Sequence, residues 1–368
     1  MINGYIFIRG WEAFPELYSF KAVYIILYLF CTLSFLVGRF LERANLSRIG
    51  GVIVWAGALW MAMFVYLLLF LLSIDVLRLI DAIIPIFPRI ITENHLQTDH
   101  ILGIIVFTVS FVVVVAGFIN ARTPRIRTID LTIPKDGHAF KSLNVVVVSD
   151  IHLGTIVCKK RIEHIVEKIN SLHPELVLLP GDVVDEDLGP VINQNLGETL
   201  RVIKAKYGVY AITGNHEYIG GADAACKYLG EHGITMIRDS VVMIENSLYI
   251  VGREDLSMRQ FGGKRRAQLE ELMAKVDKRF PVILMDHQPV HLEQAVENGI
   301  DLQLSGHTHH GQLWPFNYLT KKIYEVSWGF KKKGNTNIYV SCGVGSWGPP
   351  VRTGNSPEII NFRLTFQS

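Results

Sequence analysis

Hydrophobic residues are unevenly distributed along the chain, and its first third carries three long apolar segments without charged side chains. These segments are residues 22–38, 51–72 and 101–119. The first is at the short end of what can span a bilayer, and the second is long enough to span with some tilt. Their length and the absence of an amphipathic face argue against buried helices of a soluble core. We therefore expect residues 1–120 to form a membrane region with about three transmembrane helices.

The three apolar segments also bear on the class of membrane protein. A transporter or channel is expected to carry ionisable residues inside its spans. The three segments carry none, and Asp75, Arg78 and Asp81 follow the second segment. This pattern disfavours a transporter or channel.

Basic residues beside the spans predict the orientation of a multi-pass protein of the cell membrane. The cytoplasmic side of a membrane protein is the side richer in Lys and Arg near the spans. The first connection and the segment after the third span carry more of these residues than the opposite side. The two sets are Arg39, Arg43, Arg48, Arg122, Arg125 and Arg127 against Arg9, Lys21, Arg78 and Arg89. The bias places the C-terminal region in the cytoplasm.

After residue 120 the pattern changes to that of a soluble domain. Residues 121–140 are polar and basic, as in a connector, with a strand-like alternation at Ile129, Leu131 and Ile133. From residue 141 to 368, short apolar runs such as "LNVVVVSD" and "ELVLLPGD" are separated by helical stretches. This alternation predicts an α/β domain with largely buried strands.

Composition agrees with a part-membrane protein and excludes several classes. Of the 368 residues, 49% are hydrophobic and 19% are charged, against about 25% charged in soluble domains. The net charge of +2 gives no reason to expect a nucleic-acid partner. The four cysteines are scattered, which argues against a thiolate zinc site and a disulfide framework and favours free thiols. They are Cys31, Cys158, Cys226 and Cys342.

Residues able to bind metal follow five of the predicted strands in succession. The carboxyl ends of strands in an open α/β sheet are where ligands bind, because the turns there bring distant residues together. Positions i and i+2 of an extended segment also point the same way. The residues are Asp150 and His152, Asp182 and Asp185, Asn215, His216 and Glu217, His287, and finally His307 and His309 in "GHTHHGQ".

Each motif by itself has an ordinary structural explanation. Asp150 and His152 fit a turn with a surface histidine, Asp182 fits a helix N-cap, and Asn215 fits a left-handed turn. Two imidazoles at one strand end, His307 and His309, have fewer structural reasons to exist. The complete ordered set is much more specific than any member of it.

The ordered set D-x-H, G-D-x-x-D, G-N-H-E, a lone His and G-H-x-H resembles the calcineurin-like metallophosphoesterases. "GHTHHGQLWP" and "GVGSWGPPVRTGNSPEI" are similar to the membrane-associated bacterial branch of that superfamily, and the resemblance covers roughly residues 140–366. It implies a four-layer α/β/β/α sandwich, preceded here by an all-α transmembrane region, and a two-metal centre between the sheets. The implied ligands are Asp150, His152, Asp182 and His309 for one metal, and Asp182, Asn215, His287 and His307 for the other.

Mixed imidazole and carboxylate ligands suit two divalent transition metal ions, with Mn first and Fe, Zn or Co as alternatives. Such a pair, about 3.5–4 Å apart across the shared Asp182, generates a hydroxide near neutral pH for attack on phosphorus. His216 resembles the family's phosphate-contacting histidine and is expected to protonate the leaving oxygen or stabilise the phosphate. Asp185 is expected to orient groups around the metals. His310 stands where related sequences often have glycine and is not counted as a ligand.

The sequence predicts the substrate class less sharply than the chemistry. The expected reaction is hydrolysis of a phosphodiester or pyrophosphate bond, and a membrane-tethered hydrolase often meets a lipid-linked substrate. In "LWPFNYLTKK", Trp314 and Phe316 either reach into the membrane interface and its lipids or pack under the sheet. A degenerate enzyme, or a membrane sensor or scaffold that binds a phosphorylated ligand without turnover, stays as the alternative. The oligomeric state is not predicted.

Overall fold

The chain divides into two compact units. The structure, a computed structural model, describes residues 2–14, 20–45, 48–88, 94–135 and 139–367. The helical unit comprises residues 1–119 together with 348–353, and the sheet unit comprises residues 120–347 together with 354–368.

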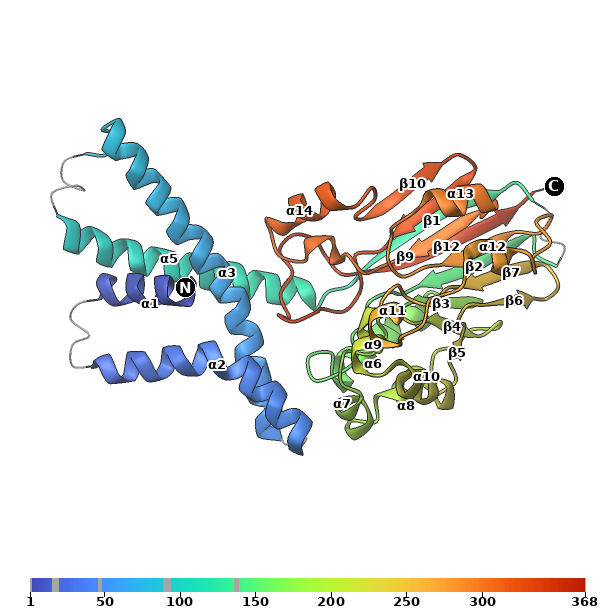
Figure 1. Cartoon of the computed structure of the whole chain (residues 1–368), viewed down its shortest axis with the longest axis horizontal. Helices are drawn as coiled ribbons and strands as arrows, with labels where there is room; N and C mark the ends of the chain where they lie inside the picture. The colour runs from blue at the N-terminus through green and yellow to red at the C-terminus, as the bar shows by residue number, and fades with distance from the viewer. Residues whose placement is uncertain (1, 15–19, 46–47, 89–93, 136–138, 368) are drawn as a thin grey trace. The chain divides into compact units, whose positions relative to one another are not determined.

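The helical unit is built on three long apolar helices, as the sequence predicts. Each of α2, α3 and α5 is long and apolar enough to cross a membrane. Each helix extends beyond the uncharged segment from which it was predicted. A shorter helix, α1, precedes them. The bounds are α1 Ile2–Ala13, α2 Lys21–Asn45, α3 Arg48–Ile83 and α5 His95–Ala121 (Figure 1).

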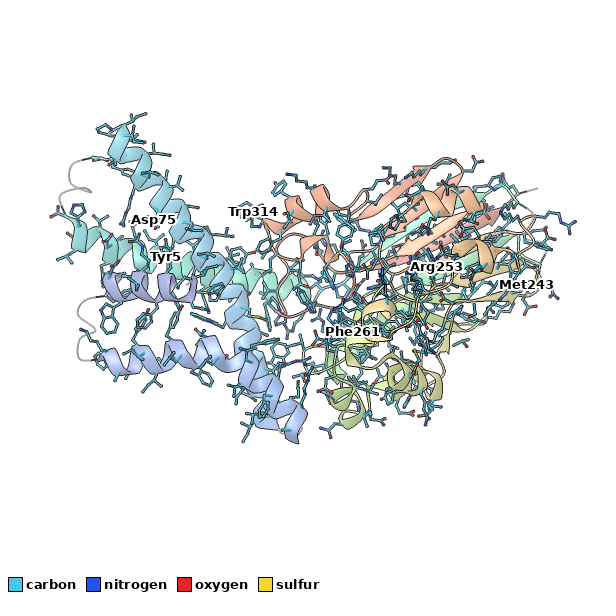
Figure 2. All side chains as sticks on the ribbon, in the orientation of Figure 1. Tyr5, Asp75, Met243, Arg253, Phe261 and Trp314 are labelled. Atoms are coloured by element: carbon cyan, nitrogen blue, oxygen red, sulfur yellow. The ribbon has the colours of Figure 1, made fainter. Side chains whose placement is uncertain are left out.

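Helix α3 continues well past the apolar segment 51–72, because no proline or glycine lies between residue 72 and Pro85. Asp75, Arg78 and Asp81, which the sequence predicts to lie beyond the second span, therefore belong to this helix. Asp75 accepts a hydrogen bond from the Tyr5 hydroxyl at 2.6 Å, and the two side chains lie together in Figure 2. Arg89, used in the orientation argument, lies outside the described residues.

Helix α1, which the apolar pattern did not predict, packs on α2 through aromatic rings. The ring of Phe7 lies 5.1 Å from that of Tyr24 and 5.2 Å from that of Tyr28. Trp11 lies 6.0 Å from Tyr24, and the Lys21 ammonium lies 4.6 Å from the centre of the Trp11 ring. These aromatic and cation–π contacts hold the short helix in place.

The sheet unit contains two six-stranded mixed sheets. The first has the order β1-β12-β2-β3-β4-β5 and the second the order β10-β11-β9-β8-β7-β6. Strands β2, β3 and β4 run parallel to one another, as do β7, β8 and β9. The first sheet comprises β1 Arg125–Ile133, β12 Glu358–Phe366, β2 Ser142–Val147, β3 Leu176–Pro180, β4 Val209–Ile212 and β5 Thr235–Met236. The second comprises β10 Gly329–Lys333, β11 Thr336–Val340, β9 Leu302–Ser305, β8 Val282–Met285, β7 Leu248–Gly252 and β6 Ser240–Ile244.

The strands alternate between two hydrophobic cores, which explains why they read as continuous apolar runs. In β2, Val145 and Val147 belong to the core between the sheets, while Val146 belongs to the core under the helices of the first sheet. In β8, Met285 faces the core between the sheets and Leu284 faces the helices of the second sheet. Because side chains alternate along a strand, a strand buried on both faces needs apolar residues throughout.

Helices cover the outer face of each sheet, which confirms the predicted four-layer α/β/β/α sandwich (Figure 1). The first sheet is covered by α6 Lys159–Ser171, α7 Leu188–Asn193, α8 Leu196–Arg201 and α10 Ala222–Glu231. The second is covered by α12 Leu269–Met273 and α13 Glu293–Asn298. The remaining helices are α9 Asn215–Gly220, α11 Met258–Phe261, the 3-10 turn η2 His309–Gly311 and α14 Phe316–Ile323.

Candidate metal centre

The metal-capable residues follow strands whose carboxyl ends share one edge of each sheet. In the first sheet, they come after β2, after β3 and at the start of α9, which follows β4. In the second sheet, they come after the parallel strands β8 and β9. This topology brings residues far apart in the sequence into one cluster between the sheets.

One half of the cluster contains Asp150, His152 and His309. One nitrogen or oxygen atom from each lies within 4.8 Å of the others. The Nε2 atoms of His152 and His309 are 2.9 Å apart, and His309 Nε2 is 3.6 Å from Asp150 Oδ1. All three side chains are buried, so this group of donors is shielded from bulk water.

The other half contains Asp182, His287 and His307, again within 4.8 Å of one another. His287 Nε2 lies 3.1 Å from Asp182 Oδ2. The Asn215 side-chain oxygen is 3.2 Å from His287 Nε2 and 2.8 Å from His307 Nδ1. His287 Nδ1 donates to the carbonyl of Pro180 at 2.8 Å, which fixes the tautomer and leaves Nε2 directed at the cluster.

Asp182 stands between the two halves. Besides His287, its Oδ2 atom is 3.9 Å from His152 Nε2, and its Oδ1 atom accepts the backbone N–H of His216 at 2.9 Å. The side chain is almost completely buried. Asp182 is therefore the carboxylate through which the two groups of donors are connected.

Glu217 holds the loop that carries Asp182, a role that the sequence reasoning did not assign. Its carboxylate accepts three backbone N–H groups, from Gly214 at 2.7 Å, Val184 at 2.8 Å and Asp182 at 3.1 Å. Glu217 is the third residue after Gly214, the N-cap of α9. A glutamate at this position is a known helix-start signal. The motif "GNHE" could therefore have predicted the capping role of Glu217.

His216 lies beside both halves of the cluster and is paired with Asp185. Its Nδ1 donates to Asp185 Oδ1 at 3.0 Å, and its ring meets that of His152 edge to face at 4.5 Å. His216, His152 and Asp182 also form a group within 4.8 Å. His216 is therefore within reach of the donors that surround Asp182.

The backbone of the cluster adopts left-handed conformations that are costly for residues with side chains. The φ angles are 53° at Asp150, 53° at His152, 52° at Asp182, 71° at His307 and 44° at His309. Each costs on the order of 1–3 kcal/mol and persists only where the surroundings enforce it. Such strain clusters at functional sites, and here it falls on five of the seven predicted ligands.

Burial controls the protonation of the cluster. It raises the pKa of Asp150 to about 6 and lowers the pKa of His152 to about 3 and that of His307 to about 4. Burial alone would raise the pKa of Asp182, but the neighbouring His287 holds it well below its usual range. His152 and His307 are thus neutral, the form that binds metal. His287 differs, because the charge of Asp182 outweighs burial and raises its pKa well above the usual value.

His216 is shifted in the opposite direction from His152 and His307. Burial alone would lower its pKa, but the hydrogen bond to Asp185 and the charges of Asp182 and Asp185 raise it to about 9. His216 therefore carries a proton at neutral pH, as a group that meets an anion or a leaving oxygen requires.

Two motif glycines provide space for the carboxylates. A Cβ atom at Gly306 would overlap the Ser149 hydroxyl and the Asp150 carboxylate, and one at Gly214 would overlap Asp182. The glycines of "GHTHH" and "GNHE" are needed for this close approach of backbone to side chain.

The donor set fits a pair of transition metal ions. It combines carboxylates, imidazoles and one amide oxygen, which suit such ions better than Mg²⁺ or Ca²⁺. His152 Nδ1 is buried without a hydrogen-bond partner among the described residues. Together, the two groups of donors form a candidate binuclear site.

The loop after the cluster separates the other predicted residues. His310 belongs to none of the metal-capable groups within the described chain, and its Nδ1 is 3.0 Å from the Ser327 hydroxyl. Leu313 is buried, whereas Trp314 is 48% and Phe316 is 42% exposed. Trp314 and Phe316 therefore do not pack under the sheet, and Trp314 projects from the loop before α14 (Figure 2).

Trp347 is a further residue beside the cluster that the sequence reasoning missed. Its ring lies 6.1 Å from that of His216, yet the side chain is 54% exposed. The Gln312 side chain bonds both the N–H and the carbonyl of Trp347, at 3.1 Å and 3.0 Å. Thirty-five residues separate this pair, so no local pattern could have revealed the contact.

Comparisons with known proteins indicate the family of the sheet unit. Residues 143–311 match the model of the calcineurin-like phosphoesterase family. An uncharacterized metallophosphoesterase of Helicobacter pylori J99 is 34% identical, over 61% of this chain and 60% of its own. One from Aquifex aeolicus is 31% identical, over 59% of this chain and 83% of its own.

Two zebrafish proteins are also similar. A transmembrane protein with metallophosphoesterase domain from Danio rerio is 29% identical, over 71% of this chain and 62% of its own. The chain thus spans about three-fifths of the length of the Helicobacter and zebrafish relatives. A solved dimetal phosphatase from Danio rerio aligns with a TM-score of 0.38 and 12% identity, over 61% of this chain and 98% of its own.

Proposed function

Because the chain belongs to the calcineurin-like metallophosphoesterases, a family of metal-dependent phosphoesterases, we propose that its sheet unit hydrolyses a phosphodiester or pyrophosphate bond. The observation that carries the proposal is the convergence of two donor groups on Asp182. One group is Asp150, His152 and His309, and the other is Asp182, His287 and His307 with Asn215. In this proposal, Asp182 bridges two divalent ions, with Mn first among the candidates and Fe, Zn or Co as alternatives.

When bound, such ions supply positive charge at the phosphate and make water acidic enough to attack phosphorus at neutral pH. The protein's own residues supply position and protons. Asp185 fixes the His216 ring through Nδ1, which leaves the Nε2 proton available for a phosphate oxygen or for the departing oxygen. We propose that Trp347, exposed beside His216, contacts the leaving group.

The proposed substrate is lipid-linked, and the surface of α14 supports this assignment. No residue of α14 is buried. Phe316, Leu319 and Ile323 follow one helical face and are 42%, 54% and 62% exposed, and the last turn carries Lys321 and Lys322. An exposed apolar face flanked by lysines fits a lipid interface with anionic headgroups.

The helix is also tied closely to the metal loop. A Cβ atom at Gly311, the last residue of η2, would overlap the backbone of Phe316. A lipid-linked phosphate held at α14 would therefore lie close to His309 in η2. Trp314 and Phe316 are proposed to receive the apolar part of such a substrate.

We place the protein in the cell membrane as a multi-pass protein with the sheet unit on the cytoplasmic side. The three long apolar helices support membrane embedding, and the basic residues of the connections support the orientation. The substrate would then be reached from the cytoplasmic leaflet.

The test is turnover by the full-length protein in vesicles supplied with Mn²⁺. The panel contains phosphomonoesters, phosphodiesters, nucleotides, phospholipids and pyrophosphate-linked lipids. We expect hydrolysis of a lipid-linked diester or pyrophosphate to exceed that of soluble esters. Metal-dependent binding of these compounds without release of product would support the sensor or scaffold alternative instead.

A further inference from the structure

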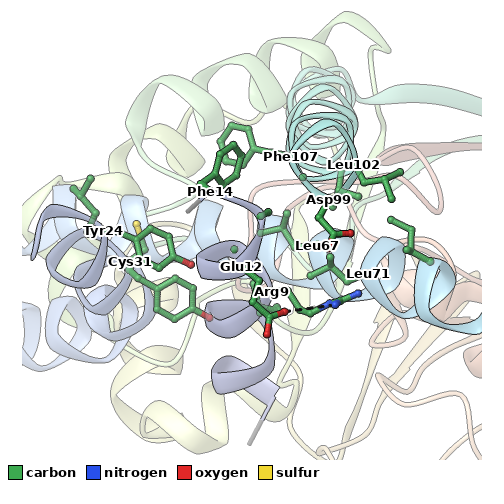
Figure 3. A pocket seen from close by; sticks show the side chains of 18 of the residues that line it. Arg9, Glu12, Phe14, Tyr24, Cys31, Leu67, Leu71, Asp99, Leu102 and Phe107 are labelled. Carbon is green, nitrogen blue, oxygen red and sulfur yellow. Dashed lines mark ion pairs between the residues drawn. The ribbon is translucent and has the colours of Figure 1, made fainter. Parts of the chain in front are cut away.

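The helical unit contains an apolar pocket of about 290 Å³ to which all four described helices contribute. Figure 3 shows Tyr24 and Cys31 of α2 on one side of it and Leu67 and Leu71 of α3 on another. The pocket is nearly twice the size of an engineered apolar cavity of ~150 Å³ that stays dry and binds benzene. It is therefore large enough to hold a substantial piece of hydrocarbon.

The pocket lies in the half of the helical bundle remote from the end of α5. Its residues on α5 run from Asp99 to Phe107, and the helix continues to Ala121. At a rise of about 1.5 Å per residue, this places the lining residues roughly 20–33 Å along the helix from Ala121. All residues that line the pocket belong to the helical unit, so the inference does not rest on the proposed catalytic chemistry.

The two tyrosine hydroxyls on the α2 wall are already bonded. The Tyr24 hydroxyl donates to the carbonyl of Phe7 at 2.9 Å, and the Tyr28 hydroxyl donates to the carbonyl of Asn3 at 2.6 Å. Gly10 makes room for this arrangement, since a Cβ there would lie 2.5 Å from the Tyr24 hydroxyl oxygen. A water molecule needs two to four polar partners, so these walls favour hydrocarbon over water.

The rim of the pocket is charged in a specific pattern. Arg9 pairs with Asp75 and lies 3.7 Å from Glu12, and Arg78 pairs with Asp99. Two guanidinium groups therefore face three carboxylates. Arg9 Nε is also buried without a hydrogen-bond partner among the described residues. The rim offers one spare donor for a phosphate oxygen and an excess of carboxylate for an amine.

We propose that this pocket binds one acyl chain of an aminophospholipid, with the headgroup phosphate at Arg9 and the amine at the rim carboxylates. The helices α2, α3 and α5 that line the pocket are long and apolar enough to cross a membrane, where lipid chains are the available hydrocarbon. An empty apolar pocket would forfeit dispersion contacts along its walls. The bound chain contacts α1, α2, α3 and α5 together and so stabilises the packing of the short helix α1.

The test uses neighbouring leucines of α3 as a matched pair. Leu71 lines the pocket, whereas Leu72 is 46% exposed and does not. Full-length protein is stripped of lipid in detergent, phosphatidylethanolamine is titrated in, and the lipid bound per chain is counted by native mass spectrometry. We expect one bound lipid per wild-type chain and a loss of affinity of at least ~5-fold in Leu71→Trp, about 1 kcal/mol, with little change in Leu72→Trp. Equal affinities of the two variants overturn the proposal.

Smaller substitutions and a second measurement keep the test valid if a variant does not fold. If the tryptophan variants do not give monodisperse protein, Leu71→Phe and Leu72→Phe replace them. The lipid-induced rise in melting temperature is measured alongside. A rise in the Leu72 variant that is absent in the Leu71 variant supports occupation of the pocket, and the same rise in both contradicts it.

The headgroup assignment has its own test. Phosphatidylethanolamine and phosphatidylglycerol with identical chains compete for the wild-type protein and for Glu12→Gln, in which one rim carboxylate is neutral. Glu12 is 56% exposed in its side chain, so this change leaves the helix packing intact. We expect wild type to prefer the amine lipid and Glu12→Gln to lose that preference. A wild-type preference for phosphatidylglycerol rules out the amine assignment.

Discussion

Asp182 is the single residue on which both halves of the proposed metal centre depend. It lies 3.1 Å from His287 and 3.9 Å from His152, which belong to different groups of donors. His310, in the same loop as His307 and His309, instead turns to Ser327. The two residues therefore make a matched test of the proposed ligand set.

Asp182→Asn is expected to remove nearly all phosphoesterase activity, by more than about 100-fold, because both ions lose their shared carboxylate. His310→Ala is expected to keep most activity. Turnover and bound metal per chain are measured for both variants at equal folding. An Asp182→Asn protein with two metals and normal turnover, or equal losses in the two variants, would falsify the ligand assignment.

His216→Ala is expected to keep its metals but to lose about 10²–10⁴-fold in turnover, the usual contribution of general acid catalysis. Elemental analysis and kinetics are read together. Substantial rescue by a good leaving group such as nitrophenolate would indicate proton donation. Loss of metal in this variant would make His216 a ligand, and an unchanged rate with both good and poor leaving groups would exclude any catalytic role.

Glu217→Ala is expected to destabilise the sheet unit by roughly 3 kcal/mol or more, since three buried N–H groups lose their acceptor at ~1–3 kcal/mol each. The N–H groups belong to Gly214, Asp182 and Val184. Denaturant unfolding of the variant is compared with that of Glu231→Ala on the exposed end of α10. Similar stabilities of the two variants would show that Glu217 does not hold the loop.

At the scale of elements, α14 differs from the other helices of the sheet unit. Helices α6, α8 and α10 bury one face against the first sheet, but α14 buries no side chain. Its exposed apolar residues continue from Trp314 in the preceding loop. A helix that buries none of its side chains and exposes an apolar face is a candidate for contact with a lipid surface.

Trp314→Ser is expected to reduce hydrolysis of a lipid-linked substrate in vesicles by roughly 5-fold or more, about 1 kcal/mol of lost apolar contact. Hydrolysis of a soluble nitrophenyl ester by the same protein should change little. Val202→Ser, at a 57% exposed position after α8, serves as the control for a lost surface hydrophobe. Equal impairment of Trp314→Ser on both substrates would leave the lipid proposal unsupported.

At the scale of the whole molecule, the chain joins a helical unit and a sheet unit with different sources of stability. The helical unit exposes apolar surface along α2, α3 and α5, as expected of helices in lipid. The sheet unit buries its apolar residues in two sheet faces and between the sheets. It also buries the carboxylates and imidazoles of the proposed metal centre.

Metal removal is expected to lower the melting temperature of the sheet unit and leave that of the helical unit unchanged. Ligand binding to the native state contributes about 2.7 kcal/mol when free metal is 100-fold above its dissociation constant. Full-length protein is melted with and without a chelator, and Mn²⁺ is then restored. The Asp182→Asn protein is the control and should not respond. A chelator-insensitive wild-type transition would count against structural occupancy by metal.

The sequence by itself determined the features that depend on local pattern. Long uncharged segments determined three apolar helices, because a helix in lipid needs apolar side chains on every face. Continuous apolar runs in short strands determined a sandwich buried on both sheet faces. The order of the motifs from Asp150 to His309 predicted one cluster, since strands of one sheet end at a common edge.

Only the tertiary structure decided the features that depend on distant neighbours. The side chain of Trp347 lies at His216 because Gln312 holds its backbone. Gln312 and Trp347 are far apart in the sequence, so no local pattern predicts their contact. The exposure of Trp314 depends on which surfaces the loop packs against. The local sequence is compatible with either a buried or an exposed tryptophan. The pocket of the helical unit exists because four helices meet without filling the space between them. Periodicity within one helix predicts which face is apolar. It does not predict the volume left between helices, because that volume depends on how the helices pack.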